Sequence, residues 1–197
     1  MKIAIDLQGI QSKGSRSRGI GRYSLEIVRN IIYSSRNHDI YLVSNAALQD
    51  VSDDFHRELK LKNVFYLEWY SPCPLSYISK NVTYDIAKIL RSYFFCSLEV
   101  DIILITSYME GFADNCSTDF DIDFVSKPII SIFYDLIPLM NPDLYFRDNP
   151  DFKKFYKSKV NNLNKLDGLL AISDSSRNEA INYLELDSSN IYNISAA

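Results

Sequence analysis

The sequence predicts an α/β fold: a doubly wound, mostly parallel, Rossmann-like sheet of about seven strands. Short apolar runs of strand length alternate along the chain with longer segments that repeat with helical period, and this alternation is typical of parallel strands joined by helices. The chain has 197 residues, of which 47% are hydrophobic, and it contains no internal repeat or linker-like tract. We therefore expect one globular domain over residues 1–197, with ligand-binding groups at the carboxyl ends of the strands.

The first strand, loop and helix lie between Lys2 and Tyr23. Ile3–Asp6 lacks the polar alternation of a half-exposed strand, so we expect it to be covered on both faces. A mostly polar, poorly ordered loop is predicted for residues 7–18, and apolar residues recur with helical period from Gly19 onward. A strand whose loop leads into a helix N-terminus can present backbone N–H groups to an anion.

Glycines and arginines surround the start of this helix. Gly19 and Gly21 suit a helix entry where side chains would clash, and steric need alone explains them. Arg16, Arg18 and Arg22 favour a second interpretation, because three guanidinium groups near a helix N-terminus suit a phosphate or a carboxylate. The sequence by itself leaves both interpretations open.

The same glycines do not fit the common nucleotide-binding motifs. In a dinucleotide fingerprint the third glycine would stand at Ser24, the glycines would follow the strand directly, and the second strand would end in an acidic residue instead of Ser44. No Gly-Lys-Ser or Gly-Lys-Thr follows the glycines, so the phosphate loop of nucleoside triphosphatases is absent. We expect no NAD, and we expect the protein to use no cofactor.

The other elements follow in order. Apolar runs predict strands at Ile40–Val43, Val64–Trp69, Asp101–Ile105, Ile129–Phe133, Gly168–Ile172 and Ile191–Ile194. A polar, helix-like piece covers Ser52–Leu59, and a turn or loop with two prolines covers Ser71–Ser79. A helical stripe is formed by Val82, Ile86, Ile89, Leu90, Tyr93 and Phe94.

The last two helices carry start signals. Asn149 is a candidate N-cap with Pro150 at the first helical position, and the apolar stripe of that helix is Phe152, Phe155, Tyr156, Val160 and Leu163. The final helix is predicted over Ser173–Leu184, with Ser176 and Glu179 spaced as a capping box.

Polar residues stand just beyond two of the predicted strands. Tyr134 and Asp135 follow the fifth strand directly, where an open α/β sheet places its ligand groups. A turn in which Asp135 caps backbone N–H groups before Pro138 explains them equally well. Glu110 and Gly111, just beyond the fourth strand, are weaker candidates on the same ground.

An acidic segment, residues 107–127, is the longest irregular stretch, and loops of this length are usually functional or mobile. Asp119–Asp123 has aspartate at every second position, as in the D-x-D of some sugar-nucleotide transferases or the start of a calcium loop. A calcium loop would need glycine at Phe124 and glutamate at Ile130, and a D-x-D would follow an apolar strand directly. We therefore interpret this segment as a solvated acidic loop and expect no metal site.

Composition excludes several classes of protein. The formal net charge of -4 and the pI near 5.2 argue against nucleic acid as a partner, because such binding needs a dominant cationic surface. The three cysteines have no C-x-x-C spacing, and we expect reduced thiols in a cytoplasmic protein. Asp6 interrupts the apolar N-terminal run, so no signal peptide is expected.

One helix face is basic. Lys153, Lys154, Lys157 and Lys165 lie opposite the apolar stripe of the helix that starts at Pro150. This face is a candidate for peripheral contact with anionic lipid at the inner face of the plasma membrane. Ordinary solvation of the lysines is the simpler explanation.

Four stretches together resemble a known family. SRSRGIGRYS, SYMEGFADN, FYDLIPLMNPDLY and LLAISDSSRNEAI are similar, in this order and along the whole chain, to the N-terminal half of family 4 glycosyltransferases. The pattern resembles the mannosyltransferase-like enzymes that build bacterial O-antigen, the polysaccharide of lipopolysaccharide, and other surface glycans. The family has the GT-B architecture, in which two Rossmann-like domains face each other across a cleft, and it uses no metal-binding D-x-D.

The resemblance implies roles for particular residues. The N-terminal domain of the family mainly holds the acceptor, and the loop after its first strand approaches the donor diphosphate, so the donor-proximal candidates are Gly19, Gly21, Arg18 and Arg22. Asp135 and Ser173 match positions that line the cleft, and Tyr134 replaces a histidine that contacts the donor sugar in many members. Together with Glu110, these three residues are the cleft or acceptor candidates.

The resemblance also implies a part that this chain lacks. Family members continue past the region that matches Asn193–Ala197 into a donor-binding domain, whose E-x7-E motif and basic residues hold the nucleotide sugar. No two glutamates here have that spacing. We therefore expect the main catalytic residues to lie in a C-terminal domain outside this chain, with a separate C-terminal half as a candidate partner, and we expect the chain alone to be inactive.

Two functions follow as hypotheses. The first is the acceptor-side domain of a retaining glycosyltransferase that moves a hexose, with mannose as the first choice, from a GDP- or UDP-sugar to a growing bacterial surface glycan or a lipid-linked acceptor. The second is a non-catalytic α/β binding or adaptor module that retains the fold and recruits a partner chain.

Overall fold

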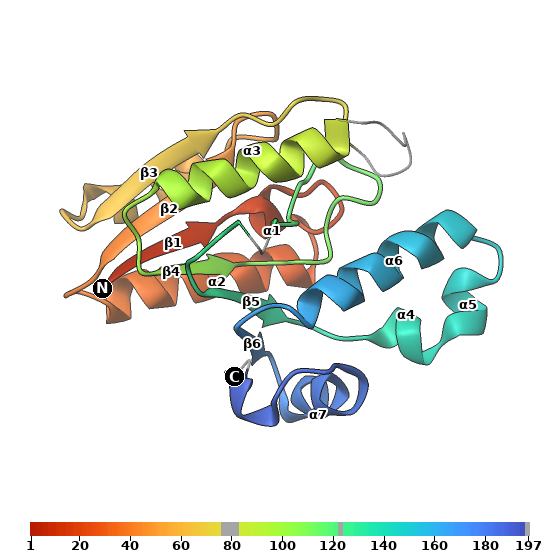
Figure 1. The fold of residues 1–197 in the computed structure, drawn as a ribbon. Helices are drawn as coiled ribbons and strands as arrows, with labels where there is room; N and C mark the ends of the chain where they lie inside the picture. Colours follow the sequence, from red (N-terminus) through yellow and green to blue (C-terminus); the bar gives the residue numbers. More distant parts are fainter. Residues whose placement is uncertain (76–82, 122–123, 196–197) are drawn as a thin grey trace.

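A parallel sheet organises the described part of the chain, which comprises residues 1–75, 83–121 and 124–195. In the computed structural model the strands lie in the order β3-β2-β1-β4-β5-β6-β7, and neighbouring strands are parallel (Figure 1). Their bounds are β1 (Lys2–Asp6), β2 (Asp39–Asn45), β3 (Val64–Trp69), β4 (Ile102–Ile105), β5 (Ile129–Phe133), β6 (Gly168–Ala171) and β7 (Ile191–Asn193). The predicted doubly wound, Rossmann-like sheet is confirmed.

The α-helices are α1 (Gln8–Gln11), α2 (Gly19–Ser34), α3 (Thr83–Ser97), α4 (Ile137–Met140), α5 (Pro142–Phe146), α6 (Pro150–Leu163) and α7 (Asp174–Tyr183). The polar, helix-like piece expected at Ser52–Leu59 forms two short 3-10 helices, Ser52–Phe55 and Glu58–Lys60, in place of one α-helix. Phe55 is the only buried residue of the first one, so the segment has no apolar stripe that would sustain an α-helix. The predicted loop Ser71–Ser79 is described as far as Leu75, and its remaining residues lie outside the described ranges.

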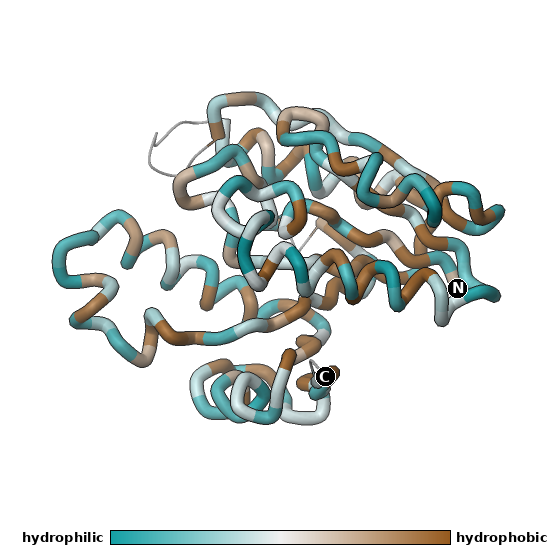
Figure 2. The backbone as a smooth tube through the Cα atoms, turned by 180° about the vertical axis from the view of Figure 1, so that it is seen from behind, coloured by the Kyte–Doolittle hydropathy of each residue, from teal (hydrophilic) through white to brown (hydrophobic). Residues whose placement is uncertain are grey.

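Two apolar clusters lie on opposite faces of the sheet, because successive residues of a strand point to opposite sides. Ile5 of β1 joins Val28 and Ile32 of α2 in one cluster. Ala4 belongs to the other cluster, which includes residues of α3, α6 and α7. Figure 2 shows mainly hydrophobic residues along the strands in the middle of the molecule. In the helices around them, hydrophobic and hydrophilic residues alternate. The sheet is thus covered on both faces, as its continuously apolar strands predict.

The predicted start of α6 is confirmed, and that of α7 is confirmed in part. Asn149 caps α6, because its Oδ1 accepts a hydrogen bond from the backbone N–H three residues on at 3.1 Å. Ser173 caps α7 by accepting from the Ser176 N–H at 3.1 Å. The expected capping box of Ser176 and Glu179 was wrong, since Glu179 instead accepts from the backbone N–H of Leu136 at 2.9 Å.

Residues 7–18, predicted as a poorly ordered loop, are held in place. All four residues of α1 are buried. The Gln8 side-chain amide bonds both the N–H and the C=O of Ser117, at 2.8 and 2.6 Å, and Gln11 does the same with Asn45, at 2.8 and 3.1 Å. Amide side chains that pair with backbone in this way satisfy polar groups that burial would otherwise leave unpaired. The polar residues of α1 therefore belong to a buried network, whereas Lys13, Gly14, Ser17 and Arg18 are exposed.

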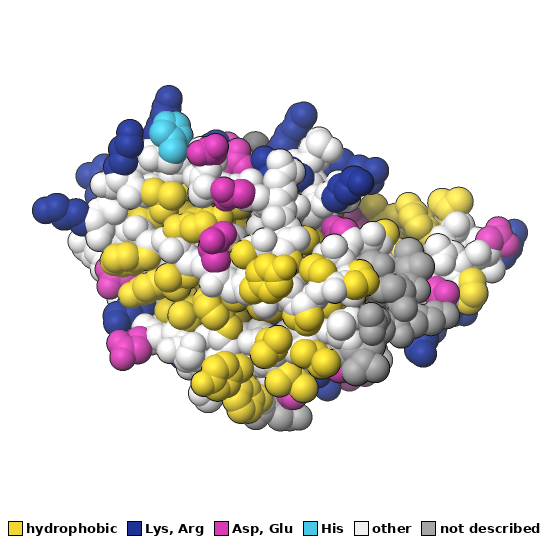
Figure 3. All heavy atoms as spheres, turned by 90° about the horizontal axis from the view of Figure 1, so that it is seen from above, with side chains coloured by type: hydrophobic (Ala, Val, Ile, Leu, Met, Phe, Trp, Pro, Cys, Tyr) yellow, Lys and Arg dark blue, Asp and Glu magenta, His cyan; other side chains and the backbone are white. Residues whose placement is uncertain are grey.

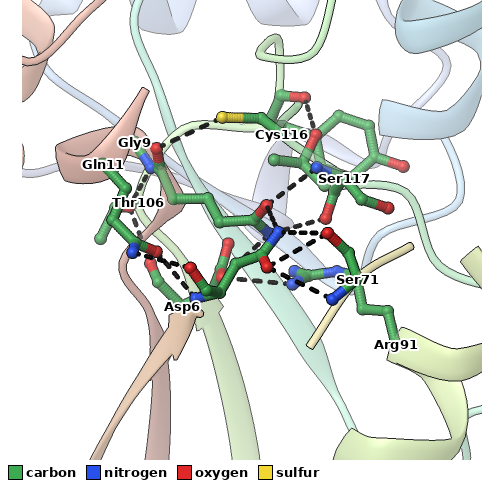
Figure 4. A network of polar contacts seen from close by, with 12 residues as sticks. Asp6, Gly9, Gln11, Ser71, Arg91, Thr106, Cys116 and Ser117 are labelled. Atoms are coloured by element: carbon green, nitrogen blue, oxygen red, sulfur yellow. Dashed lines mark hydrogen bonds and ion pairs between the residues drawn. The ribbon is translucent and has the colours of Figure 1, made fainter. Parts of the chain in front are cut away.

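The centre of this network is a buried ion pair. Asp6 ends β1, and its Oδ1 lies 3.1 Å from Nη1 of Arg91 on α3, with both side chains 0% exposed (Figure 4). The Arg91 guanidinium lies 4.2 Å from the ring centroid of Phe120 and 4.8 Å from that of Phe95. Thr106, which follows β4, donates to the carbonyl of Asp6 at 2.7 Å. The carboxyl ends of β1 and β4 are therefore fixed to each other and to α3.

Helix α3 exists as predicted, but it presents the expected apolar stripe to solvent. Ile86, Ile89, Leu90 and Tyr93 are 44%, 58%, 44% and 65% exposed, and Val82 lies outside the described residues. The buried residues of the helix are Ala87, Arg91, Ser92 and Phe95. Because Arg91 must reach Asp6, its face of the helix turns inward and the apolar stripe turns outward. Figure 3 shows hydrophobic side chains gathered on the face of the molecule that is seen from above.

The ion pair leads to a stability prediction. Replacing Arg91 by Met leaves the carboxylate of Asp6 buried without its partner, and we expect the free energy of unfolding to fall by about 3–5 kcal/mol. The double variant Asp6→Asn/Arg91→Met removes both charges and should recover a large part of this loss. Urea unfolding at neutral pH measures both values, and a loss below about 1 kcal/mol for Arg91→Met would contradict the central place of the pair.

Candidate functional site

A hollow lies at the carboxyl end of the sheet, above the point between β1 and β4 where the strand order reverses. Its volume is about 710 Å³, and open α/β sheets bind their ligands at such a point. Segments that follow β1, β4 and β5 line it, together with α5 and α6, through Ser12, Lys13, Gly14, Ser15, Arg18, Ile20, Met109, Glu110, Gly111, Phe112, Ala113, Asp114, Asp135, Ile137, Pro138, Tyr145 and Phe152. We take this hollow as the candidate functional site.

Glu110 is the most strongly held side chain of the hollow. The hydroxyls of Ser12, Ser15 and Ser107 lie 2.7, 2.5 and 2.9 Å from its two carboxylate oxygens. The Ser12 hydroxyl also lies 2.7 Å from the carboxylate of Asp114, and because it has one proton it donates to one of the two carboxylates at a time. Hydrogen bonds to an ionised carboxylate are short and strong, so they join the segment after β1 to the segment after β4. The predicted candidate Glu110 therefore lies inside the site with a fixed orientation.

Gly111 requires a backbone that other residues rarely adopt. Its φ is +103°, and a Cβ added there would lie 2.5 Å from the carbonyl oxygen of Cys116. A side chain would therefore be strained by the backbone and would also clash. This glycine lets the chain turn directly after Glu110.

The rim of the hollow is basic and one wall is aromatic. Lys13 and Arg18 are exposed lining residues. Phe112 and Phe152 lie on the wall with ring centroids 5.0 Å apart at an interplanar angle of 67°, and Tyr145 lies on the same wall. The hollow thus combines hydrogen-bond acceptors, cations at its rim and apolar ring surfaces.

The four donor-proximal candidates have different environments in the structure. Arg18 is the N-cap of α2 and lines the hollow. A Cβ added at Gly19 would meet no atom within 4 Å, whereas at Gly21 it would lie 2.5 Å from Cα of Arg16. Gly21 is therefore needed for packing at the helix entry, which is the steric interpretation. Arg22 is exposed and does not line the hollow. The proximity of these residues to a donor stays a prediction.

Arg16 has a structural partner. Its guanidinium lies 3.3 Å from the carboxylate of Asp54 and 3.5 Å from the carbonyl of Asp50. Both partners belong to the segment that follows β2. Of the three arginines near the helix start, Arg18 is therefore the one that the hollow includes.

Tyr134 is tied to the start of α2. Its hydroxyl lies 2.7 Å from that of Ser24 and 3.3 and 3.2 Å from the carbonyl oxygens of Ile20 and Thr106. Burial raises the pKa of Tyr134 above its ordinary value, so the hydroxyl stays protonated at neutral pH. This side chain joins α2 to the end of β4, and its ring lines a smaller cavity beside the hollow.

Asp135 and Ser173 have different positions. Asp135 lines both the hollow and the smaller cavity, and its Oδ1 accepts from the backbone N–H of Ile137 at 3.1 Å. The predicted turn before Pro138 and the predicted place in a cleft are therefore compatible. Ser173 is engaged as the cap of α7 and does not line the hollow. Its contact with a ligand stays a prediction.

The smaller cavity has a volume of about 90 Å³ and is mainly apolar. It shares Ile20, Met109, Asp135 and Pro138 with the hollow, so the two are adjacent. Tyr156 of α6 also lines it. A ligand group that enters the hollow can extend into this smaller cavity.

The prediction of a solvated acidic loop at residues 107–127 was wrong for Asp119. Asp119, expected in a solvated loop, is 5% exposed and lies 3.0 Å from the Nζ of Lys159, which is 1% exposed. The Tyr84 hydroxyl also donates to Asp119, and Lys159 donates to Thr118 at 2.8 Å. No group of three or more histidine, cysteine, aspartate or glutamate side chains suited to a metal occurs among residues 1–75, 83–121 and 124–195. Asp123 lies outside these ranges.

Sequence reasoning missed several residues that build the site. Lys159 falls on the apolar face of α6, four residues after Phe155, and a lone lysine in such a stripe could have indicated a buried partner. Ser12 and Ser15 carry no signal of this kind, because their contacts with Glu110 span 98 and 95 residues. Contacts over such distances depend on the topology of the sheet.

The Asp119–Lys159 pair leads to a prediction on pH. Burial acts to raise the pKa of Asp119, but the Lys159 ammonium and the Tyr84 hydroxyl outweigh it, so the pKa lies below the ordinary 3.8. A lowered pKa contributes stability that is complete above about pH 3.8 and is lost as the pH falls through the folded-state value. Urea unfolding between about pH 5 and pH 2 should show a steeper acid loss for the wild type than for Asp119→Asn, and equal slopes would contradict this assignment.

Comparisons with known proteins agree with this geometry. No family model matches the chain. Three relatives are serotype-specific mannosyltransferases WbdA of Escherichia coli, which are 30%, 27% and 27% identical over 202, 174 and 177 residues. The alignments cover 100%, 86% and 90% of this chain but 24%, 21% and 20% of the relatives. The chain thus spans less than a quarter of the length of these relatives.

Solved structures show the same fold. Phytolacca americana UGT2, in complex with UDP-2-fluoro-glucose and pterostilbene, aligns over 99% of this chain and 53% of its own, with a TM-score of 0.56 and 11% identity. A UGT transferase from Siraitia grosvenorii, in complex with UDP, aligns over 98% of this chain and 50% of its own, with a TM-score of 0.51 and 10% identity. The sheet shows a Rossmann-like α/β domain whose fold matches these two structures, and the sequence comparison shows a glycosyltransferase-like chain related to the WbdA mannosyltransferases.

Proposed function

We propose that this chain is the acceptor-side domain of a retaining glycosyltransferase. The enzyme would move a hexose, for which mannose is our first choice, from a nucleotide sugar to a growing bacterial surface glycan. The observation that carries the proposal is the similarity to a mannosyltransferase, which extends over 100% of the chain. The hollow at the switch point supports it, because it offers what a saccharide needs. Glu110, Asp114 and Asp135 can accept hydrogen bonds from sugar hydroxyls, and the aromatic wall can pack against the C–H face of a ring.

The cations at the rim of the hollow support a binding position there for the nucleotide-sugar donor. Arg18 at the start of α2 and the exposed Lys13 are cations beside the hollow, and a helix N-terminus favours negative charge. We infer that they attract the diphosphate of a GDP- or UDP-hexose, with Gly19 leaving the helix start open to it.

The main hold on the donor is assigned to protein outside this chain. The relatives are about four times longer than the aligned region, and in our proposal a second domain binds the nucleotide and stabilises the departing phosphate. Catalysis would come from orientation of acceptor and donor in a closed cleft and from electrostatic stabilisation of the leaving group. We expect the 197-residue chain alone to transfer no sugar.

The basic face of α6 is proposed as a peripheral membrane contact. Lys153, Lys154 and Lys157 of α6 and Lys165, two residues past its end, are all exposed, and clustered lysines attract anionic headgroups. No helix of the described residues is long and apolar enough to cross a membrane.

Sedimentation with vesicles tests this contact. The chain should bind phosphatidylglycerol-containing vesicles at low salt and should lose most of that binding when the four lysines are replaced by Gln, because the attraction is electrostatic. Phosphatidylcholine vesicles are the control. Equal binding of the wild type and the quadruple variant would remove this proposal.

A transfer assay tests the function. The chain, together with the protein that supplies the donor-binding half, should move labelled mannose from GDP-mannose to a mannose-terminated acceptor. Glu110→Gln keeps the size of the side chain but removes its charge, so we expect kcat/KM for the acceptor to fall at least about tenfold. Glu99→Gln is the matched control, since the Glu99 side chain is 92% exposed and lines a different, distant pocket beside Met1.

Two outcomes would contradict the proposal. Full activity of Glu110→Gln would place the acceptor elsewhere. Absence of transfer from GDP-mannose and from UDP-hexoses, in a protein whose circular dichroism shows it to be folded, would favour the adaptor hypothesis.

A further inference from the structure

The carboxylates of the hollow form no ion pair with its two lining cations among the described residues. Glu110, Asp114 and Asp135 line it, and the lining cations are Lys13 and Arg18. The cations stand exposed at the rim, so the interior is acidic and rich in hydrogen-bond acceptors.

Asp135 is the carboxylate with the greatest free capacity. The one hydrogen bond of its side chain within the described residues is from the N–H of Ile137 to Oδ1, at 3.1 Å. A carboxylate has about four acceptor sites, so Oδ2 remains available. Because Asp135 lines both the hollow and the smaller cavity beside it, a ligand group at the junction of the two lies within reach of its carboxylate.

A buried donor lies beside this acceptor. Tyr156 is 5% exposed, lines the smaller cavity together with Asp135, and its hydroxyl has no hydrogen-bond partner among the described residues. Burial, reinforced by the charges of Asp135 and Glu179, raises the pKa of Tyr156, so its hydroxyl keeps the proton. Buried polar groups are nearly always paired. An unpaired phenol and an underused carboxylate thus line one cavity, and a hydroxyl-bearing group placed between them could bond to both.

We propose that the hollow takes an uncharged hexopyranose unit, one hydroxyl of which accepts a hydrogen bond from Tyr156 and donates one to Asp135, and that it rejects saccharides that carry a carboxylate. This inference rests on the proposed function, because it names the class of saccharide that the same site binds. A sugar hydroxyl is both donor and acceptor, as the pair requires. A uronate would instead place a second negative charge beside Asp135 in partly desolvated surroundings, where like charges repel strongly.

Two saccharides that differ in one group test the discrimination. The ¹⁵N-labelled chain is titrated with methyl α-D-mannopyranoside and with the matching methyl mannopyranosiduronate, and binding is followed by amide chemical shifts. We expect the neutral sugar to shift signals of the hollow and the uronate to bind at least about tenfold more weakly. Asp135→Asn should reduce this difference to less than about threefold. Asp143→Asn is the control, because Asp143 is 89% exposed and does not line the hollow.

A second pair of variants tests the phenol. Tyr156→Phe removes a hydroxyl that has no internal partner, so the thermal midpoint should stay the same or rise. Binding of the neutral sugar should nevertheless weaken about three- to tenfold. Tyr23→Phe is the matched control, since the Tyr23 hydroxyl also lacks a partner among the described residues and Tyr23 lies outside the lining of both cavities.

The outcomes separate this inference from the proposed function. Equal binding of both saccharides would overturn the inference and leave the proposed function in place. Unchanged affinity of Tyr156→Phe would overturn the hydroxyl contact in the same way. Binding of neither saccharide to the folded wild-type chain would overturn both.

Discussion

The arrangement of the strand ends around the hollow depends on the ion pair between Asp6 and Arg91. Two charges at 0% exposure cost free energy to bury, and only close pairing and further hydrogen bonds offset that cost. Gln8 supplies one such bond to the Asp6 carboxylate at 3.3 Å, Thr106 binds the backbone carbonyl of Asp6, and aromatic rings lie against the guanidinium. The end of β1 is therefore fixed against β4 and α3, and the hollow opens directly beyond these strand ends.

A second set of polar contacts shapes the wall of the hollow. The segment after β4 has little regular structure, yet Glu110 is held by three serines and Asp119 by Lys159. Charged groups take the place of a helix here, because they anchor the backbone at separate points. Of these two carboxylates, Glu110 lines the hollow, and a carboxylate held in a fixed direction is what recognition of hydroxyl groups requires.

The elements that the sequence predicted best are those that depend on local pattern. The apolar runs of β3 and β5 matched their observed bounds, and Asn149 capped its helix as expected. The inward face of α3 was not predictable, because it follows from a contact of Arg91 with a residue 85 positions earlier. For the site, position at the strand ends indicated Glu110 and Asp135, whereas Tyr156 was read as a core residue. Its unpaired hydroxyl becomes visible only once its neighbours are known.

The central claim is that the hollow over β1 and β4 is a saccharide site. A crystal structure of this chain soaked with methyl α-D-mannopyranoside tests it most directly. We expect a sugar ring in the hollow, with hydroxyls within hydrogen-bond distance of Asp135 and Glu110 and a ring face against Phe152. A sugar bound only at the amino ends of the strands, or on the exposed face of α3, would contradict it.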